Sequence, residues 1–289
     1  RLPVETLRTA DVIGVLELAR GQVAGMPVTA LNLGVNAQAA RLRLFPLEAT
    51  LFGGRYRGDL RVDVTGDEPR LEFDEALAGI ELGPLRGSLF DARRFTGRGT
   101  GTLQGRARGI EVDDWLRTAT GSVRVDVAEG AIEGGDLWYE IRRARALLRG
   151  EPLPARPAGT PRTAFTRLQA SGRLGDGALR SDDLAMDLQY LRVAGRGRLD
   201  LVSNALDWTL DTKVLRIPDE DAASRELVDL AVPVRVTGTL ADPSIRPDLA
   251  GLARARVREE LEKRRPELER KKQELQDKLR DRLQDLFKR

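Results

Sequence analysis

The stretch from residue 232 to residue 249 alternates between apolar and polar side chains before prolines interrupt it. Val232, Val234 and Val236 point to one face of an extended chain, and the residues between them point to the other. This period of two is typical of a strand with one buried face. Gly238 and the Asp-Pro pair after it predict the end of that strand, because proline fixes φ and donates no ladder hydrogen bond. We therefore expect the closing strand of a β-rich chain here.

The same alternation recurs upstream, from residue 31 onward, and predicts a mainly β fold with antiparallel strands joined by short turns. Residues 12–23 are expected to form two short strands, since each glycine there would destabilise a helix by roughly 1 kcal/mol. Alternation is lost over residues 74–90, where a short helix from Leu82 to Leu89 is expected. The glycine-dense stretch 96–110 predicts a strand pair that bends easily.

Short helices interrupt the strands at three places. Residues 112–117 predict one helical turn, and residues 219–230 a short helix before the closing strand. The best internal helix is predicted from Asp136 to Arg149, with Asp136 as its cap and an apolar stripe at helical spacing. A proline-rich loop follows at residues 150–162. We predict one domain over residues 1–249, with this loop between two groups of strands, and a helical tail over residues 250–289.

The tail concentrates the basic charge of the chain. Its 14 basic and 9 acidic residues give +5, whereas the whole chain carries +3. A partner helix or an anionic membrane surface could bind the leucine stripe of the tail, which consists of Leu268, Leu275, Leu279, Leu283 and Leu286. A solvated helix with internal ion pairs is the plain alternative. The residues considered for lipid headgroups are Arg254, Arg256, Arg258, Lys271 and Lys272. The interleaved acidic residues and the lack of an aromatic platform argue against nucleic acid as a partner.

Composition and spacing argue against catalysis. The chain has no cysteine and no histidine, which excludes thiol nucleophiles, histidine-based triads and zinc sites built from these residues. Asp113-Asp114 and Asp182-Asp183 are adjacent carboxylates, but neighbours in a strand point to opposite faces and both pairs resemble turn residues. The glycines between residues 97 and 105 lack the Lys-Ser/Thr pair of a phosphate loop. We expect that the chain is not an enzyme and that it binds neither a cofactor nor a metal ion.

Several segments together resemble the C-terminal region of the AsmA-like proteins. They are GTGTLQG at 99–105, TGSVRVDV at 120–127, GAIEGGDL at 130–137, GRGRLDL at 195–201 and the ending VPVRVTGTLADP at 232–243. The upstream LEATLFGG at 47–54 is similar to the family's strand and Gly-Gly turn. The resemblance covers about residues 12–250.

This resemblance implies a non-enzymatic protein of the bacterial envelope whose long curved sheet forms a groove with an apolar floor. Family members are linked to outer-membrane homeostasis and to phospholipid movement between membranes. It also implies a periplasm-facing position and an inner-membrane helix that precedes Arg1. A closed β scaffold whose C-terminal helix recruits a partner in outer-membrane protein assembly is the alternative.

The strands supply candidate floor residues for phospholipid acyl chains, although alternation alone describes an ordinary core equally well. Trp115, Trp138 and Trp208 fit a membrane interface or plain packing. The predicted lipid-binding residues are Leu42, Leu44, Leu60, Val62, Val64, Val123, Val125, Val127, Leu184, Met186, Leu188, Leu206, Trp208 and Leu210.

Overall fold

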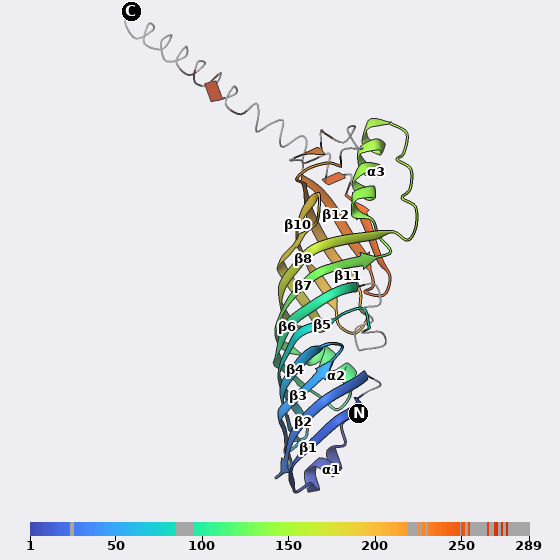
Figure 1. Ribbon diagram of the computed structural model, residues 1–289. Coiled ribbons are helices and arrows are strands. Elements are labelled where there is room, and N and C mark those ends of the chain that lie inside the picture. Colours follow the sequence, from blue (N-terminus) through green and yellow to red (C-terminus); the bar gives the residue numbers. More distant parts are fainter. Residues whose placement is uncertain are drawn as a thin grey trace, which may run out of the picture. The chain divides into compact units, whose positions relative to one another are not determined.

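A computed structural model describes residues 1–23, 26–84, 95–218, 225, 227–228, 231–248, 250–251, 254, 265, 269–270, 273 and 276. Within these residues thirteen strands form one sheet in which every strand pairs with its neighbours in the sequence, from β1 to β13. All the pairings are antiparallel. Figure 1 shows the strands crossing a long curved sheet obliquely, with β1 near one end and β12 near the other. The predicted mainly β fold is confirmed.

Strands of about ten residues dominate the described chain, and three helices interrupt them. The strands are β1 (Val12–Val23), β2 (Met26–Gln38), β3 (Arg41–Leu51), β4 (Gly54–Asp63), β5 (Arg70–Glu81), β6 (Phe95–Arg108), β7 (Thr120–Glu133), β8 (Arg162–Gly175), β9 (Ala178–Asp187), β10 (Leu191–Asp200), β11 (Leu206–Val214), β12 (Ala231–Gly238) and β13 (Pro243–Pro247). The helices are α1 (Val4–Thr9), α2 (Val112–Thr118) and α3 (Leu137–Arg149).

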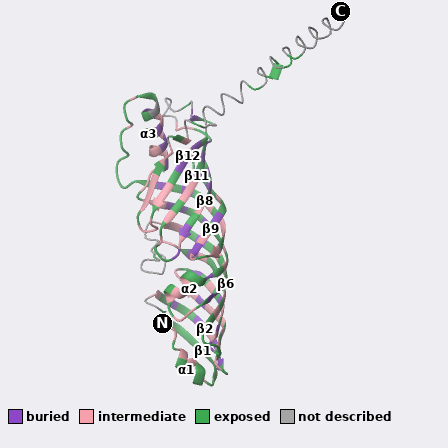
Figure 2. Ribbon diagram, turned by 180° about the vertical axis from the view of Figure 1, so that it is seen from behind, coloured by how far each residue is buried: buried purple, intermediate pink, exposed green. Residues whose placement is uncertain are grey.

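The sheet is open. In the described strands β1 and β13 each have one neighbour and do not pair with each other, so the alternative of a closed β scaffold has no counterpart there. Alternation of apolar and polar residues along each strand gives the sheet two chemically different faces. Figure 2 shows buried and exposed residues interleaved along the strands.

Four strand predictions need correction. Residues 12–23 form one strand rather than two, because pairing with β2 along almost its whole length offsets the glycines. Residues 74–81 continue β5 to Glu81 instead of losing the strand, since they pair with β4 and β6. Residues 95–108 form one strand, β6, which pairs with β5 and β7. The stretch from residue 232 closes with two strands, because Pro243 and Pro247 lie at the ends of the edge strand β13, where a missing donor costs little.

The Asp182-Asp183 pair lies inside β9 and not in a turn. The register with β10 shifts beside this pair, and Asp183 accepts hydrogen bonds from the Ser171 amide at 2.7 Å and from its hydroxyl at 2.5 Å. A β-bulge, which alternation alone does not reveal, therefore accommodates the two carboxylates.

The two internal helices agree with their predicted positions. The Asp136 side chain accepts a hydrogen bond from the Tyr139 amide at 2.9 Å and caps α3. Leu137, Ile141 and Ala144 of α3 are buried. In α2, which contains the Asp113-Asp114 pair, Glu111 and Asp114 form a capping box, so Asp114 stabilises the start of this helix.

Two compact units are present, residues 1–247 and residues 248–289. The prediction that residues 1–249 act as one groove domain stays a prediction. The Leu82–Leu89 helix lies mostly outside the described residues, as do most of the 219–230 helix, most of the tail and all five leucines of its stripe. Among the described residues no helix is long and apolar enough to cross a membrane.

Candidate functional site

One face of the sheet collects the apolar side chains, and we call it the inner face. Residues directly opposite each other on neighbouring strands point to the same face. A continuous series of such partners crosses nine strands from β3 to β11. The series runs Leu44, Leu60, Phe73, Gly105, Gly121, Leu174, Leu179, Leu199 and Leu206.

Twelve of the fourteen predicted floor residues lie within strands on this inner face. They share it with the series through further opposite pairs, such as Leu42 with Val62, and through the period of two along each strand. Met186 lies opposite Leu168, which in turn lies opposite Val127, so all three residues point to the same face. Val64 and Leu188 lie one residue beyond the ends of β4 and β9. The sequence therefore predicted which residues share a face, whereas their contact with lipid remains a prediction.

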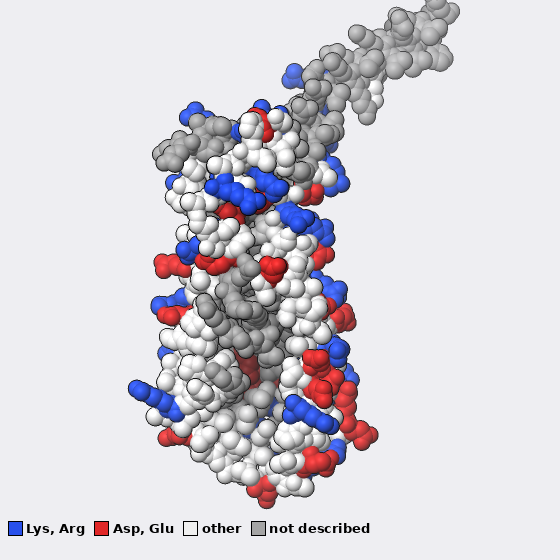
Figure 3. All heavy atoms as spheres, turned by 90° about the vertical axis from the view of Figure 1, so that its right-hand side faces the viewer, with Lys and Arg blue, Asp and Glu red and all other residues white. Residues whose placement is uncertain are grey.

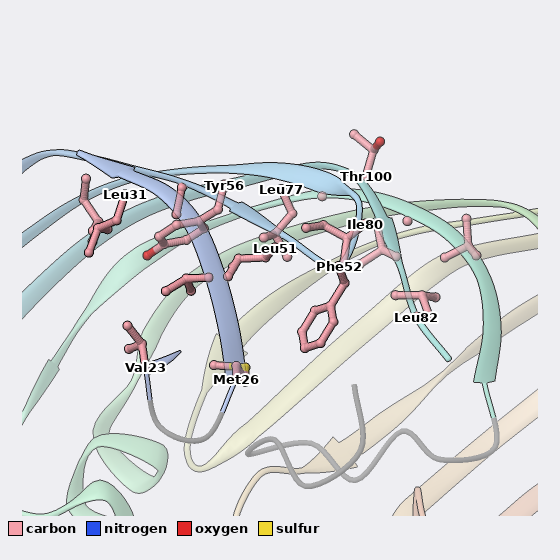
Figure 4. Close-up of a pocket in the computed structure, with 17 residues that line it drawn as sticks. Val23, Met26, Leu31, Leu51, Phe52, Tyr56, Leu77, Ile80, Leu82 and Thr100 are labelled. Atoms are coloured by element: carbon pink, nitrogen blue, oxygen red, sulfur yellow. The ribbon is translucent and has the colours of Figure 1, made fainter. Parts of the chain in front are cut away.

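The inner face is hollowed into a first cavity of about 510 Å³. Figure 4 shows the labelled residues of β1 to β6, together with Phe52 and Leu82, around it. Its lining is almost entirely apolar: Val23, Met26, Val28, Leu31, Leu47, Ala49, Leu51, Phe52, Tyr56, Leu77, Ile80, Leu82, Gly99, Thr100, Gly101, Val125 and Val127.

A second cavity of about 310 Å³ lies farther along the same face, and Val125 lines both cavities. This second cavity contains seven predicted floor residues, which come from β7, β9 and β11. They are Val123, Val125, Leu184, Met186, Leu206, Trp208 and Leu210. Trp208 therefore contributes its ring to the inner face, at a position where the facing strand has Gly197.

The remaining predicted residues lie elsewhere. Leu42 and Val62 line a hollow of about 460 Å³ whose other walls include Arg41, Arg43 and Glu72. Leu44, Leu60, Val64 and Leu188 line neither of the two apolar cavities. The apolar cavities thus occupy only part of the inner face.

Exposure differs strongly along the inner face. The side chains of Leu77 and Val125 are each 38% exposed. Met186 and Val64 are buried, and Val232 and Val234 have no exposed surface. α3 contacts β13 and β8. Part of the predicted floor therefore has the burial of a packed core, and part remains open.

Several lining residues were missed at the sequence level. Met26, Phe52, Ile80 and Leu82 surround the first cavity but lie near the ends of strands, where alternation gives way to turns. The strand pattern around Leu31 and Leu47 carried a usable signal, since it alternates as regularly as the segments that supplied the predicted floor. Figure 3 shows mostly uncharged side chains over the lower part of one side of the sheet, with charged side chains at its margins and across its upper part.

Charged residues pair on the opposite, outer face. Arg43 and Asp59 approach to 2.8 Å, and Arg167 and Asp126 to 2.5 Å. Hydrogen bonds from these arginines hold the pKa of each aspartate below its usual range. Such exposed pairs contribute little stability, but they keep the outer face polar.

In the described strands a carboxylate, Glu75, interrupts the inner face. Glu75 of β5 lies opposite Gly58 of β4 and Leu103 of β6. The Tyr56 hydroxyl donates a hydrogen bond of 2.6 Å to Glu75 Oε2. Burial raises the pKa of Glu75, and burial followed by this hydrogen bond raises the pKa of Tyr56.

No metal site emerges from the described residues, and most of the residues considered for lipid headgroups lie outside them. They contain no cluster of three or more acidic side chains that could hold a metal ion. Arg254 is exposed and lies 3.7 Å from Asp248. The other basic residues considered for headgroups (Arg256, Arg258, Lys271 and Lys272) lie outside the described part of the chain.

Comparisons with known proteins agree with this architecture. The family model described as the AsmA family matches residues 4–184. Protein AsmA of Escherichia coli (strain K12) is 22% identical over 257 residues, which cover 89% of this chain and 41% of that protein. The chain thus corresponds to less than half of the length of this relative. No solved structure shows a significant match. Because the family model covers well over half of the sequence, the chain belongs to the AsmA family.

Proposed function

We propose that the inner face of the sheet holds acyl chains of phospholipids, and that the chain contributes in this way to lipid transport and outer-membrane homeostasis. The observation that carries this proposal is the continuous inner face, which has two apolar cavities that are both lined by Val125. Membership of the AsmA family supports a function in the bacterial envelope. The proposal includes a periplasm-facing position and an inner-membrane anchor that lies outside this chain.

An apolar surface is sufficient for this task. Each methylene group that leaves water contributes about 0.8 kcal/mol, and no directional bond is needed. Leu77 and Val125 provide such a surface, since each remains partly exposed. A long sheet can hold chains in many positions of similar energy, which suits movement better than one deep site. No covalent step is part of this function.

The test is native mass spectrometry of the purified chain, combined with organic extraction and lipid analysis. We expect phospholipid in near-stoichiometric amounts. Val125→Asp should remove it, because an unpaired carboxylate in an apolar contact costs several kcal/mol or excludes the acyl chain. Ala128→Asp is the matched control, since Ala128 is exposed on the opposite face of the same strand β7.

The outcomes separate clearly if all three proteins have the same circular dichroism spectrum. Lipid on the parent chain and on Ala128→Asp, with none on Val125→Asp, would support the proposal. A folded parent chain without any bound lipid would refute it.

A further inference from the structure

Glu75 is a carboxylate on the largely apolar inner face. Its neighbours on that face of β5 are Phe73 and Leu77, and its partners across the sheet are Gly58 and Leu103. A charged side chain in such surroundings destabilises the fold unless it is paired. Its presence is therefore not explained by the packing of the sheet.

The surroundings of Glu75 have the features of a built site. Tyr56 donates its hydroxyl hydrogen bond to Glu75 Oε2 at 2.6 Å. A Cβ atom at Gly58 would clash with that same oxygen and would lie 2.9 Å from the Tyr56 hydroxyl. The absence of a side chain at Gly58 thus leaves the space that the Tyr56–Glu75 pair occupies.

The Tyr56–Glu75 pair lies at the edge of the first cavity. Tyr56 and Leu77, the next inward residue of β5 after Glu75, both line that cavity of about 510 Å³. Leu77 is 38% exposed, so the site is reachable from the surface. A molecule with its apolar part in the cavity could therefore bring a polar end to the carboxyl group.

The charge of the site favours a cation. Among the described residues Glu75 has one hydrogen-bond partner, Tyr56, and no ion pair brings it a cation. Asp74 and Asp59 lie near enough to disfavour its ionised form. A carboxylate that accepts one hydrogen bond still has a second oxygen with acceptor capacity. A positively charged donor would satisfy it, and charge-assisted bonds of this kind are among the stronger ones.

We propose that Glu75, positioned by Tyr56, binds the ammonium group of an amphiphile whose acyl chain occupies the first cavity. The proposal rests on the proposed function and names the headgroup class for one position of the groove. A headgroup with only phosphate and hydroxyl groups carries a negative charge and no positive charge, so it offers no ion pair to the carboxylate. A trimethylated ammonium has the charge but no N–H donor, so it should bind more weakly than a primary ammonium.

Lipid competition tests the proposal. The purified chain is incubated with mixed micelles of equal amounts of dioleoyl phosphatidylethanolamine, phosphatidylcholine and phosphatidylglycerol. The bound lipids are then counted by native mass spectrometry. We expect about a fivefold enrichment of the ethanolamine lipid over the glycerol lipid, as one charge-assisted hydrogen bond at a partly exposed site can provide.

Three variants assign that preference to the site. Glu75→Gln keeps the shape but not the charge, so it should retain the total lipid load and lose the enrichment. Glu72→Gln is the matched control, because Glu72 is exposed on the outer face of the same strand, and it should behave like the parent chain. Tyr56→Phe removes the hydroxyl that fixes Glu75 and should reduce the enrichment in part.

The outcomes keep the two proposals apart. Lipids bound without preference by the parent chain, or an enrichment that survives in a folded Glu75→Gln variant, would overturn this inference and leave the proposed function standing. If none of the three lipids binds, the proposed function fails and this inference fails with it. Should Glu75→Gln not fold, an unchanged preference in Tyr56→Phe would overturn the positioning of Glu75.

Discussion

At the scale of single residues, Asp63 stabilises the turn between β4 and β5. It accepts hydrogen bonds from the Thr65 amide at 2.9 Å and from the Thr65 hydroxyl at 2.5 Å, and it pairs with Arg41 at 3.1 Å. The Thr65 hydrogen bonds, followed by Arg41, lower the pKa of Asp63 from 3.8 to about 2. The ionised carboxylate is thus the form that this turn stabilises.

We expect Asp63→Asn to lower the free energy of unfolding by about 1 kcal/mol at pH 7, a value discounted for the exposure of the side chain. The folded pKa lies below the unfolded value, so this stability is present above about pH 4 and is lost as the pH falls toward 2. Urea denaturation at several pH values measures the difference between the parent chain and the variant. Asp67→Asn, an exposed change in the same turn, is the control. A difference that stays constant from pH 7 to pH 2 would contradict the assignment.

The Tyr56–Glu75 pair could not be predicted from the sequence, although the alternation that places each residue on the inner face is visible there. Alternation places Glu75 on the same face as Phe73 and Leu77. A lone carboxylate, however, more often indicates a solvated position or the end of a strand. The hydroxyl and the carboxylate meet only because β4 and β5 pair in one particular register, which leaves Gly58 between them.

At the scale of elements, α3 is the part whose burial is best explained by its sequence. Its helical stripe buries Ile141, whose side chain is 1% exposed, while Leu147 on the same helix is 49% exposed. α3 contacts β13 and β8. These contacts bury its apolar stripe.

We expect Ile141→Ala to lower the free energy of unfolding by about 2–5 kcal/mol, because the truncation leaves a cavity under the helix. Leu147→Ala is the matched control and should change it by no more than about 0.5 kcal/mol. Chemical denaturation followed by tryptophan fluorescence measures both, since Trp138 belongs to α3. Equal effects of the two substitutions would show that the stripe does not hold α3 on the sheet.

The strands could be predicted where the alternation of apolar and polar residues is regular. The predictions were wrong where pairing with neighbouring strands outweighs the local preference of the sequence. Val123, Val125 and Val127 alternate cleanly, and β7 contains all three. Residues 12–23 contain glycines that argue for a break, yet eleven cross-strand pairs hold them in a single strand. The edge strand β13 begins and ends in proline, a composition that locally indicates a loop. Pairing with a neighbour is a property of the whole sheet and cannot be read from a short window.

At the scale of the whole sheet, the order of the strands decides what the inner face can do. Every strand pairs with its neighbours in sequence, so apolar residues from distant parts of the chain form one surface without a crossover. Alternation predicted this shared face but not where it is hollowed. The hollows depend on small residues such as Gly99 and Gly101 opposite Val127 and Val125, and on residues near strand ends, such as Met26 and Phe52, that line the first cavity.

Val125 lines both cavities, and we expect its size to control the passage of acyl chains between them. We expect Val125→Trp to slow lipid transfer between donor and acceptor vesicles by roughly tenfold, equivalent to about 1.4 kcal/mol of added barrier, because the indole narrows the junction while keeping it apolar. Fluorescence dequenching of a labelled phospholipid measures the rate, and mass spectrometry should show that the bound amount is nearly unchanged. Arg124→Trp adds the same ring to the outer face of β7 and should leave the rate unaltered. If both variants transfer lipid at the rate of the parent chain, acyl chains do not pass Val125, and the two cavities act as separate sites.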